Sequence, residues 1–283
     1  MGEIPIEPGT LWPALQARAE RALRCGALEP IATESAEVEE AGIRFVVRVL
    51  AQLEQKVRAG FAQARTGANP FLPYNEDLFV ADVSQTHLCL LNKFNVLDHH
   101  LLLVTRAFEE QESLLAAADF EALAICMAEF DALGFYNSDS VAGASQRHKH
   151  LQLVPVPLGA GPERLPVDGA LADGRLPFVH AAERVDAFDG AALHETYRQL
   201  LRALHVRGLE GLEGAVSASS SYNLLVTREW MVLIPRERHE VEGVPVNALG
   251  FGGALLVRNR QQLAELRRRG PFDLLRRAGR PRG

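Results

Sequence analysis

The segment Gly143–Gln152 (GASQRHKHLQ) places two histidines and a glutamine at alternate positions, directly after a run of small and polar residues. Alternate side chains of a β-strand point to the same face of the sheet. If the segment is extended, His148, His150 and Gln152 share one face and Leu151 lies on the other. The pattern therefore predicts a strand that presents two imidazoles and a carboxamide beside a loop rich in backbone N–H donors.

This row of side chains favours chemistry at a phosphorus atom. One imidazole can attack as the nucleophile, while its neighbours hold oxygen atoms and fix the tautomer of the attacking ring. Gly143, Ser145 and Gln146 can supply amide and side-chain donors to phosphate oxygens. A His-x-His pair can also bind a metal ion or lie on the surface without a function. The alternation, the third polar position and the Gly-Ala-Ser-Gln entry together favour the phosphate interpretation.

The composition is typical of a soluble globular protein: of 283 residues, 47% are hydrophobic and 23% are charged. The formal net charge of −6 argues against nucleic acid as a partner, because nucleic-acid-binding proteins usually carry a basic domain. Basic residues do gather near the C-terminus, where we expect a solvated helix end and a frayed tail. They are Arg267, Arg268, Arg269, Arg276, Arg277, Arg280 and Arg282.

The three cysteines, Cys25, Cys89 and Cys126, lie far apart in the chain, which argues against a disulfide framework and a thiolate zinc site. Cys126 falls in an apolar helical pattern and is expected in the core. The start of the chain has no signal pattern, and no segment is apolar enough to span a membrane. We therefore expect a cytoplasmic protein with no membrane partner and no metal site of its own.

Hydrophobic periodicity predicts strands separated by helices in the first half of the chain. Helices are expected at Leu11–Leu28 and from an N-cap at Asp119 to a stop at Gly134, and Ala51–Ala64 is expected to be helical or irregular. The strands expected before the histidine strand are Ile43–Leu50, Leu78–Val83, Thr86–Asn92, Leu101–Thr105 and, with a turn, Phe135–Ser140. The three from Leu78 to Thr105 form an antiparallel meander.

After the histidine strand, Pro155–Pro177 is rich in proline and glycine and is expected to be a linker or flexible excursion. The elements expected beyond it are a helix at Ala191–His205, a loop at Gly208–Ser221, strands at Tyr222–Val226, Met231–Pro235 and Gly250–Val257, and a final helix capped by Asn259 and ending at Arg269. The order lacks a regular strand–helix–strand alternation, and no dinucleotide or P-loop glycine motif is present. We therefore expect an α+β fold, an antiparallel sheet flanked by helices.

Several short motifs occur in the order found in one known family. They are Asn69–Phe71 (NPF), Leu90–Phe94 (LLNKF), His100–Thr105 (HLLLVT), Gly134–Ser138 (GFYNS), the histidine segment, Ser221–Thr227 (SYNLLVT), Ile234–Arg236 (IPR) and Leu249–Phe251 (LGF). This set resembles the diadenosine tetraphosphate (Ap4A) phosphorylases. These enzymes are also called ATP adenylyltransferases, and they form a branch of the histidine-triad (HIT-like) superfamily. The resemblance extends from Gly42 to Val257.

The resemblance implies a HIT-like α+β fold in which residues 1–283 form one ATP adenylyltransferase unit. Residues 42–158 would form the core with the histidine strand, and residues 178–283 would complete the nucleotide site. The implied reaction is phosphorolysis of Ap4A by inorganic phosphate to ADP and ATP through a covalent AMP-histidine intermediate. The partners would be the dinucleoside polyphosphate, ATP, ADP and phosphate. The protein itself needs no cofactor, although Mg²⁺ can accompany the substrate phosphates, and we expect a monomer.

By the same resemblance, His150 is the nucleophile, and His148 and Gln152 are the other catalytic residues. His148 would orient or donate to phosphate. Gln152 stands where hydrolytic histidine-triad proteins carry a third histidine. A carboxamide cannot shuttle protons at neutral pH, which favours phosphate over water as the acceptor. Lys93 is the best candidate for a cationic phosphate contact. The other implied substrate-binding residues are Lys56, Asn92, Asn137, Ser138, Gly143, Ala144, Ser145, Gln146, Asn223, Thr227, Met231 and Arg236.

One position departs from the family pattern. Arg147 stands where the family usually has a proline, which would fix φ at the entry to the strand. The change removes no reacting group, and we expect Arg147 to be a solvated surface residue.

Other functions stay open on the sequence alone. Galactose-1-phosphate uridylyltransferase-like enzymes share the His-x-His-x-Gln pattern, but they typically have proline between the histidines, where this chain has Lys149. Many of them also carry metal sites. A non-catalytic nucleotide-binding protein would not need a nucleophile. A metal-binding β-protein could use His148 and His150 as ligands, but the sequence places no third ligand nearby.

Overall fold

The computed structural model describes residues 6–51, 69–204 and 220–282. Its strands are β1 (Thr33–Glu40), β2 (Ile43–Leu50), β3 (Phe79–Asp82), β4 (His87–Leu91), β5 (Leu101–Thr105), β6 (Ala132–Asn137), β7 (His150–Pro155), β8 (Ala181–Arg184), β9 (Tyr222–Val226), β10 (Trp230–Pro235), β11 (Glu240–Val241), β12 (Val244–Pro245) and β13 (Ala254–Val257). Its helices are α1 (Leu11–Cys25), α3 (Ala117–Glu129), α4 (Asp168–Ala172), α5 (Gly190–Ala203), α6 (Ala248–Phe251), α7 (Arg260–Arg269) and α8 (Pro271–Ala278), with a 3₁₀ turn at Glu76–Leu78.

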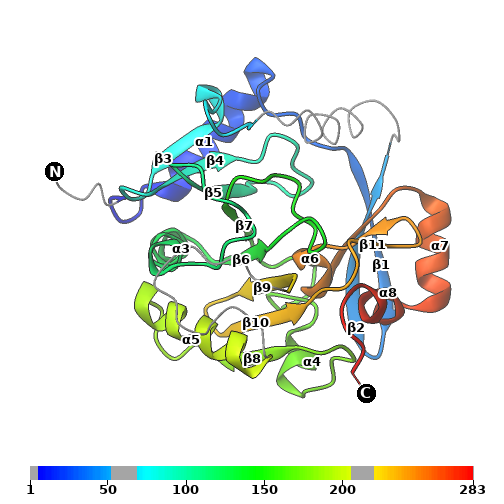
Figure 1. The fold of residues 1–283 in the computed structure, drawn as a ribbon. Helices are drawn as coiled ribbons and strands as arrows, with labels where there is room; N and C mark the ends of the chain where they lie inside the picture. The colour runs from blue at the N-terminus through cyan, green and yellow to red at the C-terminus, as the bar shows by residue number, and fades with distance from the viewer. Residues whose placement is uncertain (1–5, 52–68, 205–219, 283) are drawn as a thin grey trace.

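One large antiparallel sheet organises the fold, which confirms the expected α+β class (Figure 1). Its eight strands follow the order β3-β4-β5-β7-β6-β9-β10-β8, so β7 lies near the middle. Strands β8, β9 and β10, which follow residue 178, belong to the same sheet, because β9 pairs with β6. A three-stranded sheet, β1-β2-β13, stands beside it, with β1 antiparallel and β13 parallel to β2.

Two hydrophobic cores cover the two faces of the large sheet. The first core lies between the sheet and helices α1, α3 and α5, and it contains Leu151 and Leu153 of β7. The second core contains Val154 of β7 and joins the other face to β2, β13 and helices α4, α6, α7 and α8. The strands therefore send alternate side chains into different apolar layers, as period-2 patterning requires, and for β4 and β5 the second layer is a separate cluster that contains Leu90 and Leu102. The side chains of His150 and Gln152 belong to the face of the second core.

Several expected elements are confirmed. Strands β3, β4 and β5 form the antiparallel meander, and β9 pairs with β10 as a hairpin. Helix α7 begins after Asn259, whose Oδ1 accepts a hydrogen bond from the Gln262 N–H at 2.8 Å. Cys126 is fully buried, as expected of a core cysteine. Nearly all of the predicted segments Ala51–Ala64 and Gly208–Ser221 lies outside the described residues.

The predicted helix from Asp119 to Gly134 is wrong at both ends. The helix begins at Ala117, so Asp119 is inside the first turn, and its Oδ2 accepts from the Ala116 N–H at 2.6 Å. The helix ends at Glu129, and Gly134 belongs to strand β6. A Cβ at Gly134 would lie 2.9 Å from Leu123 Cδ1, so this glycine lets α3 pack closely on the sheet rather than ending the helix.

Pro155–Pro177 is packed structure rather than a flexible linker. It contains α4, and four of its leucines are buried in the second core: Leu158, Leu165, Leu171 and Leu176. The predicted strand Gly250–Val257 is also only half correct, because its first residues complete helix α6 and the strand begins at Ala254. In both segments, tertiary burial overrides the local composition.

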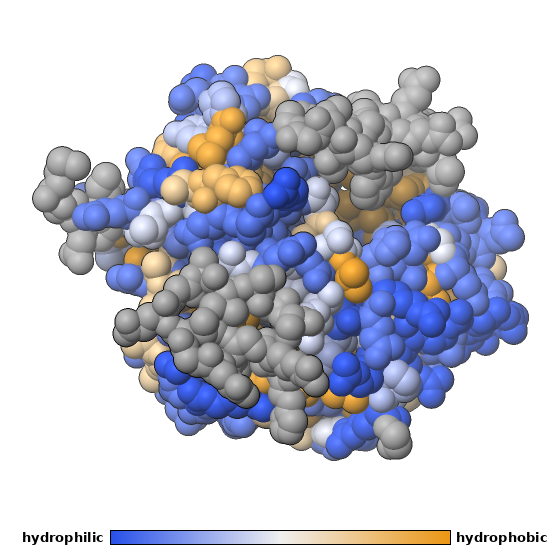
Figure 2. Space-filling model, viewed as in Figure 1, coloured by the Kyte–Doolittle hydropathy of each residue, from blue (hydrophilic) through white to orange (hydrophobic). Residues whose placement is uncertain are grey.

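The sequence patterns missed β1, β8 and α8. Strand β1 is largely exposed and rich in glutamate, so its alternation carries little hydrophobic signal. The expected frayed tail is wrong, because Phe272, Leu274 and Leu275 of α8 pack into the second core. Arg267, Arg268 and Arg269 of α7 and Arg276 of α8 are exposed, as expected, and much of the face drawn in Figure 2 is hydrophilic. No helix within the described residues is long and apolar enough to cross a membrane.

Replacing Leu275 with alanine tests whether α8 is part of the core. Leu275 is fully buried, so we expect Leu275→Ala to lower the free energy of unfolding by about 2–5 kcal/mol. The neighbouring exposed Arg276 is the control, and Arg276→Ala should change it by less than about 0.5 kcal/mol. Urea denaturation followed by circular dichroism measures both. Equal effects of the two substitutions would mean that α8 does not pack as described.

Candidate active site

The histidine segment forms a strand, as the alternation predicts. His150 and Gln152 lie on one face of β7, and Leu151 and Leu153 lie in the core on the other face. Strand β7 begins at His150, and His148 is joined to Glu110 by an isolated β-bridge just before it. All three polar side chains are buried, with exposed fractions of 1% for His148, 4% for His150 and 8% for Gln152. The structure therefore brings the two imidazoles and the carboxamide together, as expected, where little of their surface is accessible to solvent.

The tautomer of His150 follows from its hydrogen bond. Its Nδ1 lies 2.8 Å from the backbone oxygen of His148, and a carbonyl can only accept, so Nδ1 carries the proton. The lone pair is then on Nε2. Burial lowers the pKa of His150 to about 4, so the ring is neutral at neutral pH. His150 thus combines a fixed orientation with an unprotonated nitrogen, the properties that a nucleophilic imidazole needs.

Both ring nitrogens of His148 are bonded to the protein. Its Nε2 donates to the Thr105 carbonyl at 2.8 Å. Asn69 Oδ1 accepts from the Phe71 N–H, so Asn69 Nδ2 is the atom that donates to His148 Nδ1, at 2.9 Å. No ring nitrogen of His148 is left to contact phosphate. This corrects the expectation of a direct phosphate contact: His148 holds the strand entry and supplies the carbonyl that orients His150.

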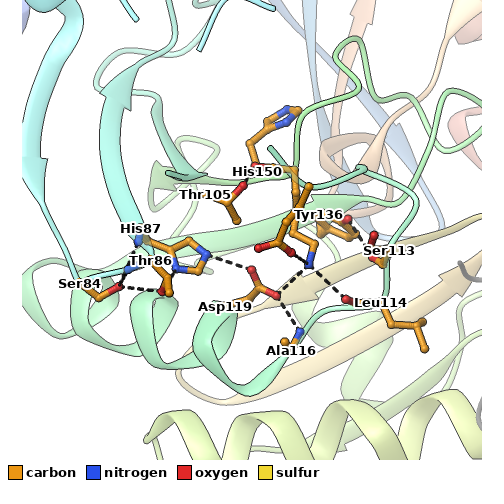
Figure 3. Close-up of polar contacts among 12 residues, drawn as sticks. Ser84, Thr86, His87, Thr105, Ser113, Leu114, Ala116, Asp119, Tyr136 and His150 are labelled. Carbon is orange, nitrogen blue, oxygen red and sulfur yellow. Dashed lines mark hydrogen bonds and ion pairs between the residues drawn. The ribbon is translucent and has the colours of Figure 1, made fainter. Parts of the chain in front are cut away.

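Lys149 points to the opposite side of the strand from the two histidines. Its Nζ lies 2.7 Å from Glu109 Oε2 and 3.3 Å from Asp119 Oδ2, and its side chain is 2% exposed. Asp119 also accepts from His87 Nε2 at 2.9 Å, which links α3, β4 and the histidine strand. In Figure 3 the His150 ring points away from Asp119. The ion pair therefore anchors the strand on the side opposite the histidines, and it does not occupy the face that carries His150.

Asp119 is ionised at neutral pH despite its burial. Burial by itself raises the pKa of its carboxyl, but the hydrogen bond from His87 and the charge of Lys149 outweigh it, and the pKa lies below its usual value. A second support comes from Gln111, whose Oε1 accepts from the His150 N–H at 2.9 Å and whose Nε2 donates to the Asn137 carbonyl at 2.7 Å. Gln111 thus joins β6 and β7 at the site.

The loop before the histidines lies at the same edge of the sheet. Gly143 has φ +101°, and a Cβ there would lie 2.9 Å from Asn247 Cβ, so only glycine fits. The Ala144 N–H donates to the Asp139 carbonyl at 2.8 Å. Ser145 is exposed and Gln146 is half-buried, which leaves the loop open toward a ligand. Ser138 is buried next to it, and its Oγ accepts from the Tyr222 N–H at 2.9 Å.

Arg236 is a buried clamp rather than a phosphate ligand, which corrects the expectation from the sequence. Its five N–H donors meet five oxygens, namely Asn223 Oδ1 and the carbonyls of Ala142, Arg238, Val246 and Ala278. A guanidinium only donates, so Asn223 must use its Nδ2 to donate to Asn137 Oδ1, at 2.8 Å. Asn137 Oδ1 accepts from the Ala248 N–H as well. Arg236 thus sets the amide orientation of Asn137.

Other predicted residues lie in different places. Met231 is fully buried in the first core, on the opposite face of the sheet from His150, so it cannot touch the same substrate. Thr227 follows the far end of β9 from Asn223, where its Oγ1 accepts from the Trp230 N–H. These positions correct the expectation that both contact the nucleotide. Lys93 is half-buried, and its Nζ is 3.3 Å from Glu29 Oε1. Lys56 lies outside the described residues.

His100, which no sequence pattern marked as a site residue, lies behind Gln152. The ring of His100 is buried, and its Nε2 is 2.9 Å from Gln152 Oε1. Its Nδ1 is 3.2 Å from Asn92 Nδ2. The Asn92 N–H also bonds the His100 carbonyl, so the pair sits where β4 and β5 meet. The predicted β4–β5 hairpin places His100 beside Asn92, but Gln152 becomes its neighbour only through the pairing of β5 with β7, which no local signal gives.

Arg147 is a surface residue, as expected, with 82% of its side chain exposed and a 2.6 Å ion pair to Glu110. Within residues 6–51, 69–204 and 220–282, no cluster of three or more histidine, cysteine, aspartate or glutamate side chains could hold a metal ion.

Comparison with known proteins identifies the family. The model of the Ap4A phosphorylase N-terminal domain matches residues 1–173, and that of the ATP adenylyltransferase C-terminal domain matches residues 174–281. The chain belongs to the Ap4A phosphorylase family. As a member of this family it is a nucleotidyltransferase of the ATP adenylyltransferase type.

Two yeast proteins are similar in sequence. Diadenosine 5',5'''-P1,P4-tetraphosphate phosphorylase 2 of Saccharomyces cerevisiae is 30% identical over 232 residues, which cover 70% of this chain and 71% of the relative. Protein APA1 of the same yeast is 26% identical over 274 residues, covering 85% of this chain and 84% of the relative. Each alignment therefore reaches into both halves of the chain.

The fold is also similar to solved structures. The crystal structure of yeast Ap4A phosphorylase Apa2 superposes with a TM-score of 0.78 at 24% identity, covering 98% of this chain and 96% of that chain. The structure of Apa2 in complex with Ap4A gives a TM-score of 0.79 at 23% identity, covering 98% and 99%. The family fold is thus present over nearly the whole chain.

Removing the charge of Lys149 tests the support under the histidine strand. We expect Lys149→Met to lower the free energy of unfolding by about 3–5 kcal/mol, because Asp119 would be left as a buried charge without its cationic partner. Arg147→Met is the matched control on the adjacent residue, and its exposed ion pair should be worth less than about 1 kcal/mol. Chemical denaturation measures both. A loss for Lys149→Met as small as that of the control would contradict the buried ion pair.

Proposed function

We propose that the chain phosphorolyses Ap4A with inorganic phosphate and produces ADP and ATP. Family membership supports this reaction, and the Apa2 structure determined with Ap4A shows that a protein of the same fold binds this dinucleotide. The observation that carries the proposal is the fixed neutral tautomer of His150. Its Nδ1 is bonded to the His148 carbonyl, which leaves Nε2 as a nucleophile.

The reaction proceeds in two displacements. His150 Nε2 attacks the α-phosphorus of Ap4A, the P–N bond forms, the bond from phosphorus to the bridging oxygen breaks, and ATP leaves. The ring of the adenylyl-histidine is then cationic, and the His148 carbonyl stabilises it through the Nδ1 proton. An oxygen of inorganic phosphate attacks the same phosphorus next. The P–N bond breaks, ADP forms, and His150 returns to its neutral state.

The residues around His150 contact different parts of the substrates. Gln152 donates to an oxygen of the phosphate that accepts AMP, and Asn137 and Ser138 hold the adenosine end. The N–H groups of Gly143 and Ala144 are bonded to the Ser140 and Asp139 carbonyls, so Ser145 and Gln146 supply the donors of this loop to phosphate oxygens. Lys93 and Lys56 supply positive charge to the polyphosphate, and Asn92 and Asn223 act by holding neighbouring side chains. Mg²⁺ enters with the substrate phosphates rather than through a protein site.

Product analysis tests the proposed reaction directly. We expect Ap4A and phosphate to give equal amounts of ATP and ADP, with no turnover when phosphate is absent. His150→Ala should lower kcat by at least about 10³-fold, because the nucleophile is lost, while Ap4A binding by calorimetry is retained. Adenine-labelled Ap4A in the absence of phosphate, quenched with denaturant at alkaline pH because a P–N bond to histidine hydrolyses in acid, should leave label on the wild-type protein only. Formation of AMP and ATP without phosphate would instead indicate a hydrolase.

The same assay can identify a uridylyltransferase. Turnover of UDP-glucose with galactose 1-phosphate, together with no reaction of Ap4A, would overturn the proposal in favour of that enzyme class. Ligand binding without label transfer would indicate a nucleotide-binding protein.

The depressed pKa of His150 predicts an unusual pH profile. Because protonation blocks Nε2, and the pKa is about 4, kcat/KM for Ap4A should stay level from about pH 8 to pH 5 and fall only as the pH approaches 4. An ordinary histidine would lose activity through its usual pKa of about 6.5. The internal phosphates of Ap4A are strongly acidic and do not titrate in this range. A fall centred near pH 6.5, with circular dichroism unchanged, would show that the nucleophile is not desolvated.

A further inference from the structure

A chain of three hydrogen bonds, in which the donor and the acceptor of each bond are fixed, ends at Gln152. The backbone N–H of Phe94 can only donate, and it donates to Asn92 Oδ1 at 3.3 Å. The amide nitrogen of Asn92 is therefore the atom facing His100, and it donates to His100 Nδ1 at 3.2 Å. With Nδ1 accepting, the proton of the neutral ring is on Nε2, which donates to Gln152 Oε1 at 2.9 Å. No step of this chain can be reversed without losing a bond.

The surroundings of His100 keep its ring neutral. The side chain is 8% exposed, and the ring of Phe135 lies 5.8 Å from it, centroid to centroid. Burial, together with the nearby His150, lowers the pKa of His100 to about 4 against the opposing hydrogen bond to Gln152. At working pH the ring therefore has a single tautomer. That tautomer holds the carboxamide of Gln152 with its oxygen turned toward His100.

The consequence concerns what Gln152 can offer to a substrate. Its oxygen is occupied by His100, so the free part of the carboxamide is the NH₂ group, on the strand face that it shares with His150. An NH₂ group donates to the oxygens of an anion, whereas a carbonyl oxygen repels an anion and accepts from water. The orientation set by His100 therefore decides which of two acceptors, phosphate or water, is held next to the adenylyl group.

We propose that His100 is a positioning residue for acceptor selection: through Gln152 it favours phosphate over water as the group that takes AMP from the enzyme. This inference rests on the proposed phosphorolysis through His150. In phosphorolysis a phosphate oxygen bonds to phosphorus, the P–N bond breaks and ADP leaves. In hydrolysis a water oxygen forms that bond, the P–N bond breaks, AMP leaves and one proton is released. A flipped Gln152 would orient the water of the second reaction.

The first test replaces the imidazole of His100 with a ring that has no hydrogen-bond donor. We expect His100→Phe to raise the KM for phosphate by about 10- to 100-fold, the effect of losing one hydrogen bond to a charged group. The ratio of AMP to ADP among the products should rise with it, while the KM for Ap4A changes little. His100→Gln restores a donor at the same distance along the side chain, and it should recover most of the phosphate affinity. Equal losses in the two variants would overturn the proposal.

The control variant uses the adjacent histidine. The ring of His99 packs on Trp12, 5.1 Å away, and has φ +56°, which asparagine tolerates. His99→Asn should leave the product ratio unchanged, and a rise in AMP equal to that of His100→Phe would contradict a specific effect. Adding His100→Phe to Gln152→Ala should change the product ratio no further, because His100 acts through the carboxamide. Additive effects would indicate a structural loss instead.

A tautomer measurement separates this inference from the proposed function. Nitrogen-15 NMR of the wild-type protein, assigned by the signal that disappears in His100→Phe, should show His100 as the neutral Nε2–H tautomer between about pH 6 and 8. A proton on Nδ1 would overturn the inference even if phosphorolysis is observed. If the tautomer is as expected but Ap4A is not phosphorolysed, the proposed function fails, and the selection of phosphate as acceptor fails with it.

Discussion

The hydrogen bond from His150 Nδ1 to the carbonyl of His148 is the contact on which the site depends. It exists only if the backbone from residue 148 to residue 150 is extended and the carbonyl is held still. Three supports hold that backbone: the bonds on both nitrogens of His148, the amide of Gln111 on the His150 N–H, and the buried ammonium of Lys149 on the opposite side. A nucleophile oriented in this way needs little reorganisation when a phosphoryl group arrives.

The polar groups of the site share one principle of construction. Each chain of hydrogen bonds begins at a group that can only donate: the N–H of Phe71 for Asn69, the N–H of Phe94 for Asn92, and the guanidinium of Arg236 for Asn223. Every later member of the chain then has one permitted orientation. The first chain fixes His148, whose carbonyl orients His150, and the other two end at the carboxamides of Gln152 and Asn137. Buried amides and imidazoles, which could otherwise flip, thereby present one defined face to the ligand.

The sequence predicts local features well and long-range ones poorly. Alternation placed His150 and Gln152 on one face, and short apolar runs located β4, β5 and β9, because these signals lie within a few residues. Nothing local marks Gly134 as the contact of α3 with the sheet, or the leucines of Pro155–Pro177 as core. Both carboxylate partners of Lys149, and the Ala142 and Ala278 carbonyls that Arg236 bonds, lie 30 or more residues away. From the sequence Arg236 is therefore predicted to bind phosphate, and only its five acceptors in the structure show that it has a structural role.

The contacts around Arg147 show why the entry to the histidine strand does not need a proline. Proline would restrict φ at the entry to the strand, but here other bonds set the same geometry. The carbonyl of Arg147 accepts from the Gln111 N–H at 2.7 Å, and the next residue, His148, is joined to Glu110 by a β-bridge. The segment Glu109–Gln111 therefore pairs with the entry as a strand would, and it also supplies the carboxylate that binds Lys149. Because pairing from outside fixes this backbone, the residue at 147 is free to face solvent.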